Sequence, residues 1–181
     1  MKREDLISEL GNYKTQFDEE RLFIPIFIDL LENQENCFER SLVSGHITGS
    51  AWVLNESFTK ALFVHHVKLN RWLQPGGHAD GDENIHHVAM KELREETGVV
   101  TVKPYTTTIF DLDVHKIPVN RKVPEHNHFD IRYLFVVSDK AKLTVSKESK
   151  EVKWWHLMDV PKIVDNEHSI MRMVAKSNLL N

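Results

Sequence analysis

Three glutamates in one short segment have the clearest capacity for chemistry. Glu92, Glu95 and Glu96 lie at relative positions 0, 3 and 4, and residues three and four apart are neighbours on a helix. Like charges at this spacing repel each other unless a cation lies among them. Because carboxylate oxygens suit hard divalent ions, which keep further positions for water and substrate phosphates, the spacing predicts a site for Mg²⁺ or Mn²⁺.

The residues around these glutamates predict an amphipathic helix that holds them on one face. Ile85, Val88, Ala89 and Leu93 recur at helical spacing, and Gly98 follows as a stop signal. The alternative is an ordinary solvated acidic helix face, which explains most runs of charge. That alternative does not explain the glycine pair that leads into the helix or the glycine that closes it.

The spacing extends well beyond the three carboxylates. Gly77 is followed after five residues by Glu83, and after seven more by the run KELREETGV. This segment resembles the Nudix box, G-x5-E-x7-R-E-U-x-E-E-x-G-U, in which U is aliphatic. Every fixed position matches except one, because Lys91 stands where the family has arginine. The resemblance is specific within Gly77–Val99 and looser over the surrounding domain.

The resemblance implies a fold and a reaction. The expected fold is α/β, a Nudix-like α/β/α sandwich with a mixed β-sheet. Residues 1–40 would form an N-terminal helical extension packed on the domain, and residues 41–181 the Nudix hydrolase domain. The implied reaction is metal-dependent hydrolysis of a pyrophosphate linkage in a nucleoside diphosphate linked to another moiety. A divalent ion is needed there to screen the phosphate oxygens and to lower the pKa of bound water.

The resemblance also implies roles for residues of the box. Glu92 and Glu96 are the expected metal ligands, and Glu95 is a third ligand or orients the attacking water, so the three together form the expected catalytic set. The backbone carbonyl of Gly77 is a further expected ligand, since close approach of the backbone leaves no room for a Cβ. Glu83 and Lys91 are expected to support the site by pairing with each other, with a looser hold than a two-pronged arginine gives.

A second group of polar residues lies in a predicted strand. Alternation along a strand places His126, His128, Asp130 and Arg132 on one face. We expect His128, Asp130 and Arg132, together with His78 after the glycine pair, to bind substrate; the alternative is a solvent-facing polar strand edge. Nudix proteins often recruit an acidic ligand from outside the box, and the candidates here are Glu125, Asp130, Glu148 and Glu151. His86 and His87 are expected at the surface.

Composition bounds the remaining possibilities. The chain has 181 residues, a charged fraction of 28% and a net charge of -4, which argue for one ordinary globular domain and against broad capture of nucleic acid or anionic membrane. Cys37 is the only cysteine, so no internal disulfide and no cysteine-based zinc site can form. The charged N-terminus and the lack of a long apolar run predict a cytoplasmic protein.

The elements that must position these residues follow from patterning. Residues 3–37 read as helical, with Pro25 starting or bending a helix, and could pack on the domain or form a homodimer contact. Strands are expected over 47–54, 61–67, 106–114, 129–137 and 152–157, and a helical pattern returns over 159–180. Strands interrupted by one helix, with helices at both ends, fit a mixed sheet between helical layers.

Two alternative functions were weighed. One is a non-catalytic Nudix module that binds a nucleotide or metabolite, although degenerate modules tend to lose the glutamates that this chain keeps. The other is an isomerase of the isopentenyl diphosphate type, which shares the fold and carries a histidine where His78 lies. Its catalytic cysteine would fall at Gly76, and Cys37 lies far upstream. The substrate class cannot be chosen from the box, because specificity in this fold lies in other loops and strand faces.

Overall fold

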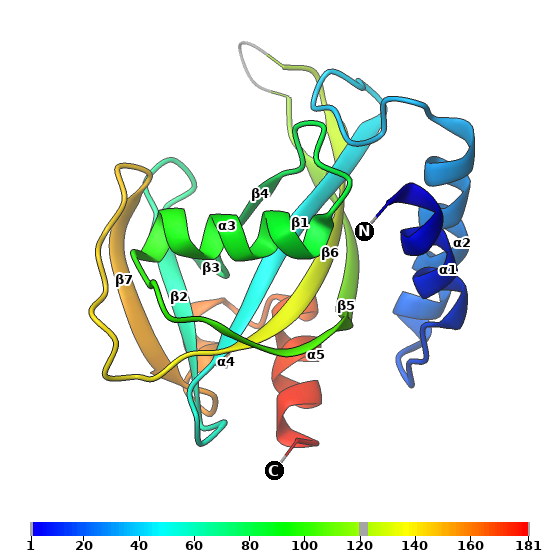
Figure 1. Ribbon diagram of the computed structural model, residues 1–181. Coiled ribbons are helices and arrows are strands. Elements are labelled where there is room, and N and C mark those ends of the chain that lie inside the picture. Colours follow the sequence, from blue (N-terminus) through cyan, green and yellow to red (C-terminus); the bar gives the residue numbers. More distant parts are fainter. Residues whose placement is uncertain (1, 120–122, 181) are drawn as a thin grey trace.

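The computed structural model describes residues 2–119 and 123–180 (Figure 1). Along the chain, the helices are α1 (Arg3–Asn12), α2 (Asp18–Asn33), α3 (Ile85–Thr97), α4 (Val160–Ile163) and α5 (His168–Asn178). The strands are β1 (Gly45–Leu54), β2 (Lys60–His66), β3 (Arg71–Leu73), β4 (Gly76–His78), β5 (Lys103–Ile117), β6 (His126–Val136) and β7 (Ser149–His156). Among the described residues, none of the helices is long and apolar enough to cross a membrane.

The sheet is mixed and divides into two parts along β1. The order β3-β2-β1-β6-β5 runs through the sheet, with β4 added to β1 and β7 added to β2. β1 runs parallel to β6, whereas the other pairs are antiparallel. The register joins β1 to β2 only at Leu54 and Ala61, whereas β4 pairs with β1 over Thr48–Ser50. β4 is therefore held beside the middle of β1, next to the part of α3 that carries Glu92 and Glu96.

Helices cover both faces of the sheet. A Cβ on Gly49 would meet Ile85 and Val88, so this face of β1 lies against α3. Trp52 points the other way, where its indole N–H donates to Ser177 of α5 (2.8 Å). Two apolar clusters fill these two interfaces. The predicted α/β/α arrangement with a mixed sheet is confirmed.

α3 forms where the sequence pattern placed it. The side chain of Asn84 accepts a hydrogen bond from the backbone N–H of His87 and caps the first turn, and Gly98 ends the helix in a left-handed conformation (φ 70°). Ile85 and Leu93 are fully buried, so one face of the helix is fixed on the sheet. Because α3 is fixed on the sheet, the positions of its glutamates relative to β4 are fixed as well.

The N-terminal helices pack against the rest of the chain. Leu6 and Leu10 of α1 and Phe27 of α2 are fully buried in the same cluster as α3, and the rings of Phe27 and Phe129 meet edge to face at 5.6 Å. Pro25 lies inside α2 instead of starting it. The N-terminal helices thus contact the core, while the division into an extension over residues 1–40 and a domain over residues 41–181, and the homodimer contact, stay predictions.

Candidate active site

The Gly76–Gly77 strand lies directly against the glutamates of α3. A Cβ on Gly77 would come within 2.7 Å of the carboxyl carbon of Glu92 and 2.9 Å of both its oxygens. The backbone of Gly76 hydrogen-bonds to the Glu96 carboxylate. Any side chain at position 77 would fill the space that these carboxylates occupy, which explains why this residue is a glycine.

Glu92 and Glu96 are crowded carboxylates on one side of α3. Burial, followed by the charges of Glu92 and Glu148, raises the pKa of Glu96 to about 8. Burial also raises the pKa of Glu92, although Lys91 opposes the rise. Within the part of the chain that the structure describes, Glu96 Oε2 is buried and has no hydrogen-bond partner. A buried oxygen without a partner, among carboxylates that repel each other, suits a hard divalent ion.

Glu148 is the acidic residue that the fold brings to the box from outside. Its charge raises the pKa of both Glu92 and Glu96, so its carboxylate lies within electrostatic reach of both. Of the other three candidates, Glu125 is paired with Lys116 at 3.2 Å, and Asp130 is buried in a different cluster. Glu151 is exposed on β7, opposite His65. Glu148 is thus the candidate whose charge acts on both of these Nudix-box glutamates.

The expected pairing of Glu83 with Lys91 is wrong. Glu83 accepts a hydrogen bond from the backbone N–H of Arg3 (3.1 Å), and its side chain lies 3.8 Å from the Arg3 guanidinium. Lys91 Nζ instead lies 4.0 Å from Glu92 Oε1 and 4.0 Å from the exposed Glu95. Lys91 therefore neutralises part of the acidic cluster, and Glu83 links the box to the N-terminal extension.

Arg40 is a cation of the site that the sequence analysis missed. Its guanidinium holds the carboxylate of Asp80 (Nε to Oδ1 2.6 Å) on the loop after β4. That hydrogen bond raises the pKa of Arg40 against its desolvation, and Glu92 and Glu148 raise it further. Arg40 is therefore near enough to the box to meet an anionic substrate. The segment before β1 has no motif that would have pointed to it.

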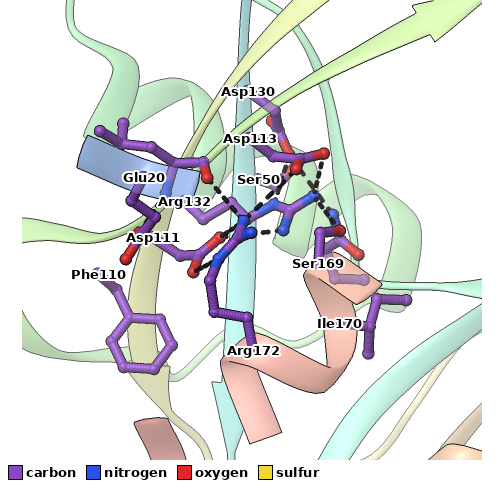
Figure 2. Close-up of polar contacts among 12 residues, drawn as sticks. Glu20, Ser50, Phe110, Asp111, Asp113, Asp130, Arg132, Ser169, Ile170 and Arg172 are labelled. Carbon is purple, nitrogen blue, oxygen red and sulfur yellow. Dashed lines mark hydrogen bonds and ion pairs between the residues drawn. The ribbon is translucent and has the colours of Figure 1, made fainter. Parts of the chain in front are cut away.

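Asp130 and Arg132 lie away from solvent. Both are 2% exposed, and every guanidinium nitrogen of Arg132 is bonded (Figure 2). Its nitrogens donate to Asp130 (2.8 Å), Asp111 (3.1 Å), Asp113 (3.2 Å) and Ser169 (3.1 Å). Because these two side chains have no free polar edge, we correct their expected role from substrate contact to structural support.

The same network ties α5 and the N-terminal extension to the sheet. Arg172 of α5 donates to both oxygens of Asp111 (2.9 Å each), and Lys176 bridges Asp111 (2.8 Å) and Glu20 (2.6 Å). Glu20 is fully buried. Three cations thus share four buried carboxylates, which keeps the desolvated charges paired.

The histidines near the site differ in their surroundings. His78 and His128 are partly exposed and lie on the same sheet face, where His46 of β1 joins them. His86, expected at the surface, packs its ring against Tyr133 (5.0 Å) and Phe135 (5.2 Å). His87 is exposed, as expected, and lies 2.7 Å from Asp82.

A sequence model described as NUDIX domain matches residues 46–174. The chain belongs to the Nudix family. A relative from Lactococcus lactis subsp. cremoris (strain MG1363), named probable DHNTP pyrophosphohydrolase, is 31% identical over 139 residues, which cover 76% of this chain and 81% of the relative. These matches confirm the prediction of a Nudix hydrolase.

Solved structures share the fold. A hydrolase of the NUDIX family from Clostridium perfringens has a TM-score of 0.58 and 21% identity, and the match covers 75% of this chain and 98% of that one. An Ap4A hydrolase from C. elegans in a binary complex has a TM-score of 0.59 and 16% identity, with 74% and 96% covered. At these identities the structures show the Nudix fold alone.

The close approach of the Nudix-box glycine to Glu92 can be tested by Gly77→Ala. The added methyl group would displace the Glu92 carboxylate, so we expect turnover to fall about 10- to 100-fold, the usual effect of a misplaced catalytic group. Gly11→Ala is the matched control, because nothing lies within 4 Å of that position. Steady-state rates measure the effect, and wild-type turnover in Gly77→Ala would refute the contact.

Proposed function

We propose that this Nudix protein hydrolyses a pyrophosphate linkage in a nucleoside diphosphate linked to another moiety, with Mg²⁺ or Mn²⁺ as cofactor. One observation carries the proposal: Glu92 and Glu96 lie together beside the Gly76–Gly77 backbone, and the charge of Glu148 acts on both. An acidic cluster of this kind has little structural value by itself, because its members repel each other.

The donor set fits a divalent ion. Glu92, Glu96 and Glu148 would hold it, with the carbonyl of Gly77 as a further ligand. When bound, such an ion neutralises charge on the pyrophosphate and lowers the pKa of bound water. Glu95, whose side chain is more exposed than that of Glu92, would orient the water and accept its proton. Arg40 is placed to bind a phosphate group of the substrate, and its bond to Asp80 holds it at the rim of the site.

Relatives narrow the substrate class only in part. The Lactococcus relative is named for DHNTP, and its identity to this chain makes DHNTP a candidate substrate here. His78 and His128 stay predicted substrate contacts, since both are partly exposed. The small-molecule diphosphate derivative remains the proposed ligand.

The two alternatives lack support in the structure. An isomerase of the isopentenyl diphosphate type needs an acid–base cysteine in the site, whereas Cys37 is fully buried in the apolar cluster. A binding module needs no crowded, unpaired carboxylates, because those are costly to keep without a metal-dependent role.

The proposal is tested by product release from a substrate panel. Nucleoside triphosphates, ADP-ribose, dinucleoside polyphosphates, sugar nucleotides and DHNTP would each be incubated with Mg²⁺, with Mn²⁺ and with a chelator. We expect one class to release phosphate, pyrophosphate or a nucleoside monophosphate, and only with a metal ion. If no compound in the panel releases product, the non-catalytic binding module becomes the favoured function.

Restoring the arginine of the Nudix box is expected to be tolerated. Lys91 lies 4.0 Å from two carboxylates and is half exposed, so Lys91→Arg keeps the charge and gains a fork that can bind a carboxylate at two points. Turnover should be unchanged or raised a few-fold in a steady-state assay. A collapse of the rate would show that the ammonium itself has a role that the family pattern does not contain.

A further inference from the structure

A triangle of histidines lies on the opposite face of β4 from the Nudix-box glutamates. His46 pairs with His128 across β1 and β6, and His78 pairs with Thr48 across β4 and β1. Because alternate residues of a strand share a face and paired residues point the same way, the three rings project together. Gly77, next to His78, faces Glu92 instead, so the strand separates the two clusters.

The triangle is compact. The ring centroids lie 5.0 Å apart along all three edges, and one ligand atom from each ring lies within 4.8 Å of the other two. A tetrahedral ion with nitrogens at about 2.0–2.1 Å separates its ligands by roughly 3.3 Å. Small rotations of the side chains would therefore bring all three nitrogens to one ion.

The free nitrogens are in the form that binds metals. His46 Nδ1 lies 3.4 Å from the carbonyl oxygen of Leu42, which can only accept, so Nδ1 carries the proton and Nε2 keeps its lone pair. His46 is 2% exposed, and in the described part of the chain its Nε2 and that of His128 are buried without a hydrogen-bond partner. Unpaired buried nitrogens are costly, and a metal ion would satisfy them.

The surroundings keep the imidazoles neutral. Burial, followed by the charges of neighbouring groups, lowers the pKa of His128 to about 2. Burial also lowers the pKa of His46. Neutral imidazole is the state that coordinates a metal, so no proton has to be displaced near neutral pH.

We propose that His46, His78 and His128 form a transition-metal site for Zn²⁺ or a similar imidazole-preferring divalent ion, distinct from the carboxylate site. Three imidazoles are poor ligands for Mg²⁺ and good ones for Zn²⁺. A three-nitrogen site also leaves a fourth position for water or an oxygen of a substrate. The ion would join β1, β4 and β6 at one end and fix the strand that carries Gly77.

The test is Zn²⁺ binding to the full chain, measured by competition with a chromophoric chelator after all metals have been stripped. Excess Mg²⁺ fills the carboxylate site during the titration. We expect one equivalent of Zn²⁺ in the wild type and an affinity lower by about 100-fold or more in His78→Gln and in His128→Gln, since loss of an outer-shell partner alone costs 10- to 100-fold. Glu92→Gln should bind Zn²⁺ as the wild type does.

His115→Gln is the matched control, because that ring lies 5.5 Å from His128 but is held by Asp113 outside the triangle. Its Zn²⁺ affinity should stay within about 10-fold of the wild type. Zn²⁺ binding that is lost in Glu92→Gln and kept in His128→Gln would overturn the proposal, as would no binding in the wild type.

If the histidine variants fail to fold, the visible spectrum of the Co²⁺-loaded wild type decides. Intense absorption indicates nitrogen ligands in a tetrahedral site, and weak absorption contradicts the proposal. These readouts do not depend on hydrolysis.

Discussion

Glu96→Gln is expected to lower turnover by about 10²- to 10⁴-fold. Removing one ligand of a catalytic metal site costs several kcal/mol of transition-state stabilisation, and each 1.36 kcal/mol is about tenfold in rate. Glu96 is the glutamate with the most strongly raised pKa and the unpaired buried oxygen. An amide keeps the shape of the side chain and removes the charge that would hold the ion.

Glu96→Gln is also expected to change how the stability of the protein depends on pH. Because the folded-state pKa of Glu96 lies above its ordinary value, the wild-type protein loses stability as the pH rises from about 4.5 to about 8 in the absence of metal. Glu96→Gln removes that loss, so its melting temperature at pH 8 in chelator should equal or exceed that of the wild type. Glu32→Gln, exposed on α2, is the control for both measurements. Full turnover in Glu96→Gln would remove the proposed metal site.

Arg132→Met is expected to lower the free energy of unfolding by about 3–5 kcal/mol. The substitution leaves Asp111, Asp113 and Asp130 buried with one cation fewer, and breaking a buried ion network from one side carries a cost of this size. For a chain of this length the melting temperature should fall by roughly 6–20 °C. Thermal and urea unfolding measure the effect.

An exposed ion pair supplies the control for Arg132. Arg21 and Asp18 are mostly exposed on the first turn of α2, so Arg21→Met should change the free energy of unfolding by less than about 1 kcal/mol. If Arg132→Met were as mild as Arg21→Met, the buried network would not be what joins α5 to the sheet.

The network also makes the stability of the wild type depend on pH in the acid range. Burial opposes ionisation of Asp113, but Arg132 and His115 outweigh it and lower the pKa to about 2. A lowered carboxyl pKa contributes stability above its ordinary value of 3.8, which is lost as the pH falls toward 2. Wild type should therefore lose stability between about pH 4 and pH 2, and Arg132→Met should lose less over that interval.

The sequence predicted those parts of the fold in which every local signal agrees. For α3, the apolar spacing and the closing glycine both point to one helix, and the helix runs from Ile85 to Thr97. The short strands β3 and β4 were not predicted, because three residues carry too little periodicity. β4 exists because the glycines fit between β1 and the carboxylates of α3.

The errors at the site came from partners distant in sequence. Alternation in β6 correctly placed Asp130 and Arg132 on one face, yet it could not show that α5 covers that face through Ser169. Likewise, Glu83 contacts Arg3 near the start of the chain and not Lys91, which lies on the same segment as Glu83. Spacing shows which way a side chain points, whereas its partner depends on packing that only the fold reveals.

The most direct test of the account is Mn²⁺ binding measured by electron paramagnetic resonance alongside turnover of the best substrate in the panel. The titration would compare the wild type with the Glu92→Gln/Glu96→Gln double variant. We expect the wild type to bind Mn²⁺ and to turn over substrate only with metal, and the double variant to lose both properties together while it stays folded. Turnover that persists in chelator, or in a double variant that no longer binds Mn²⁺, would contradict it.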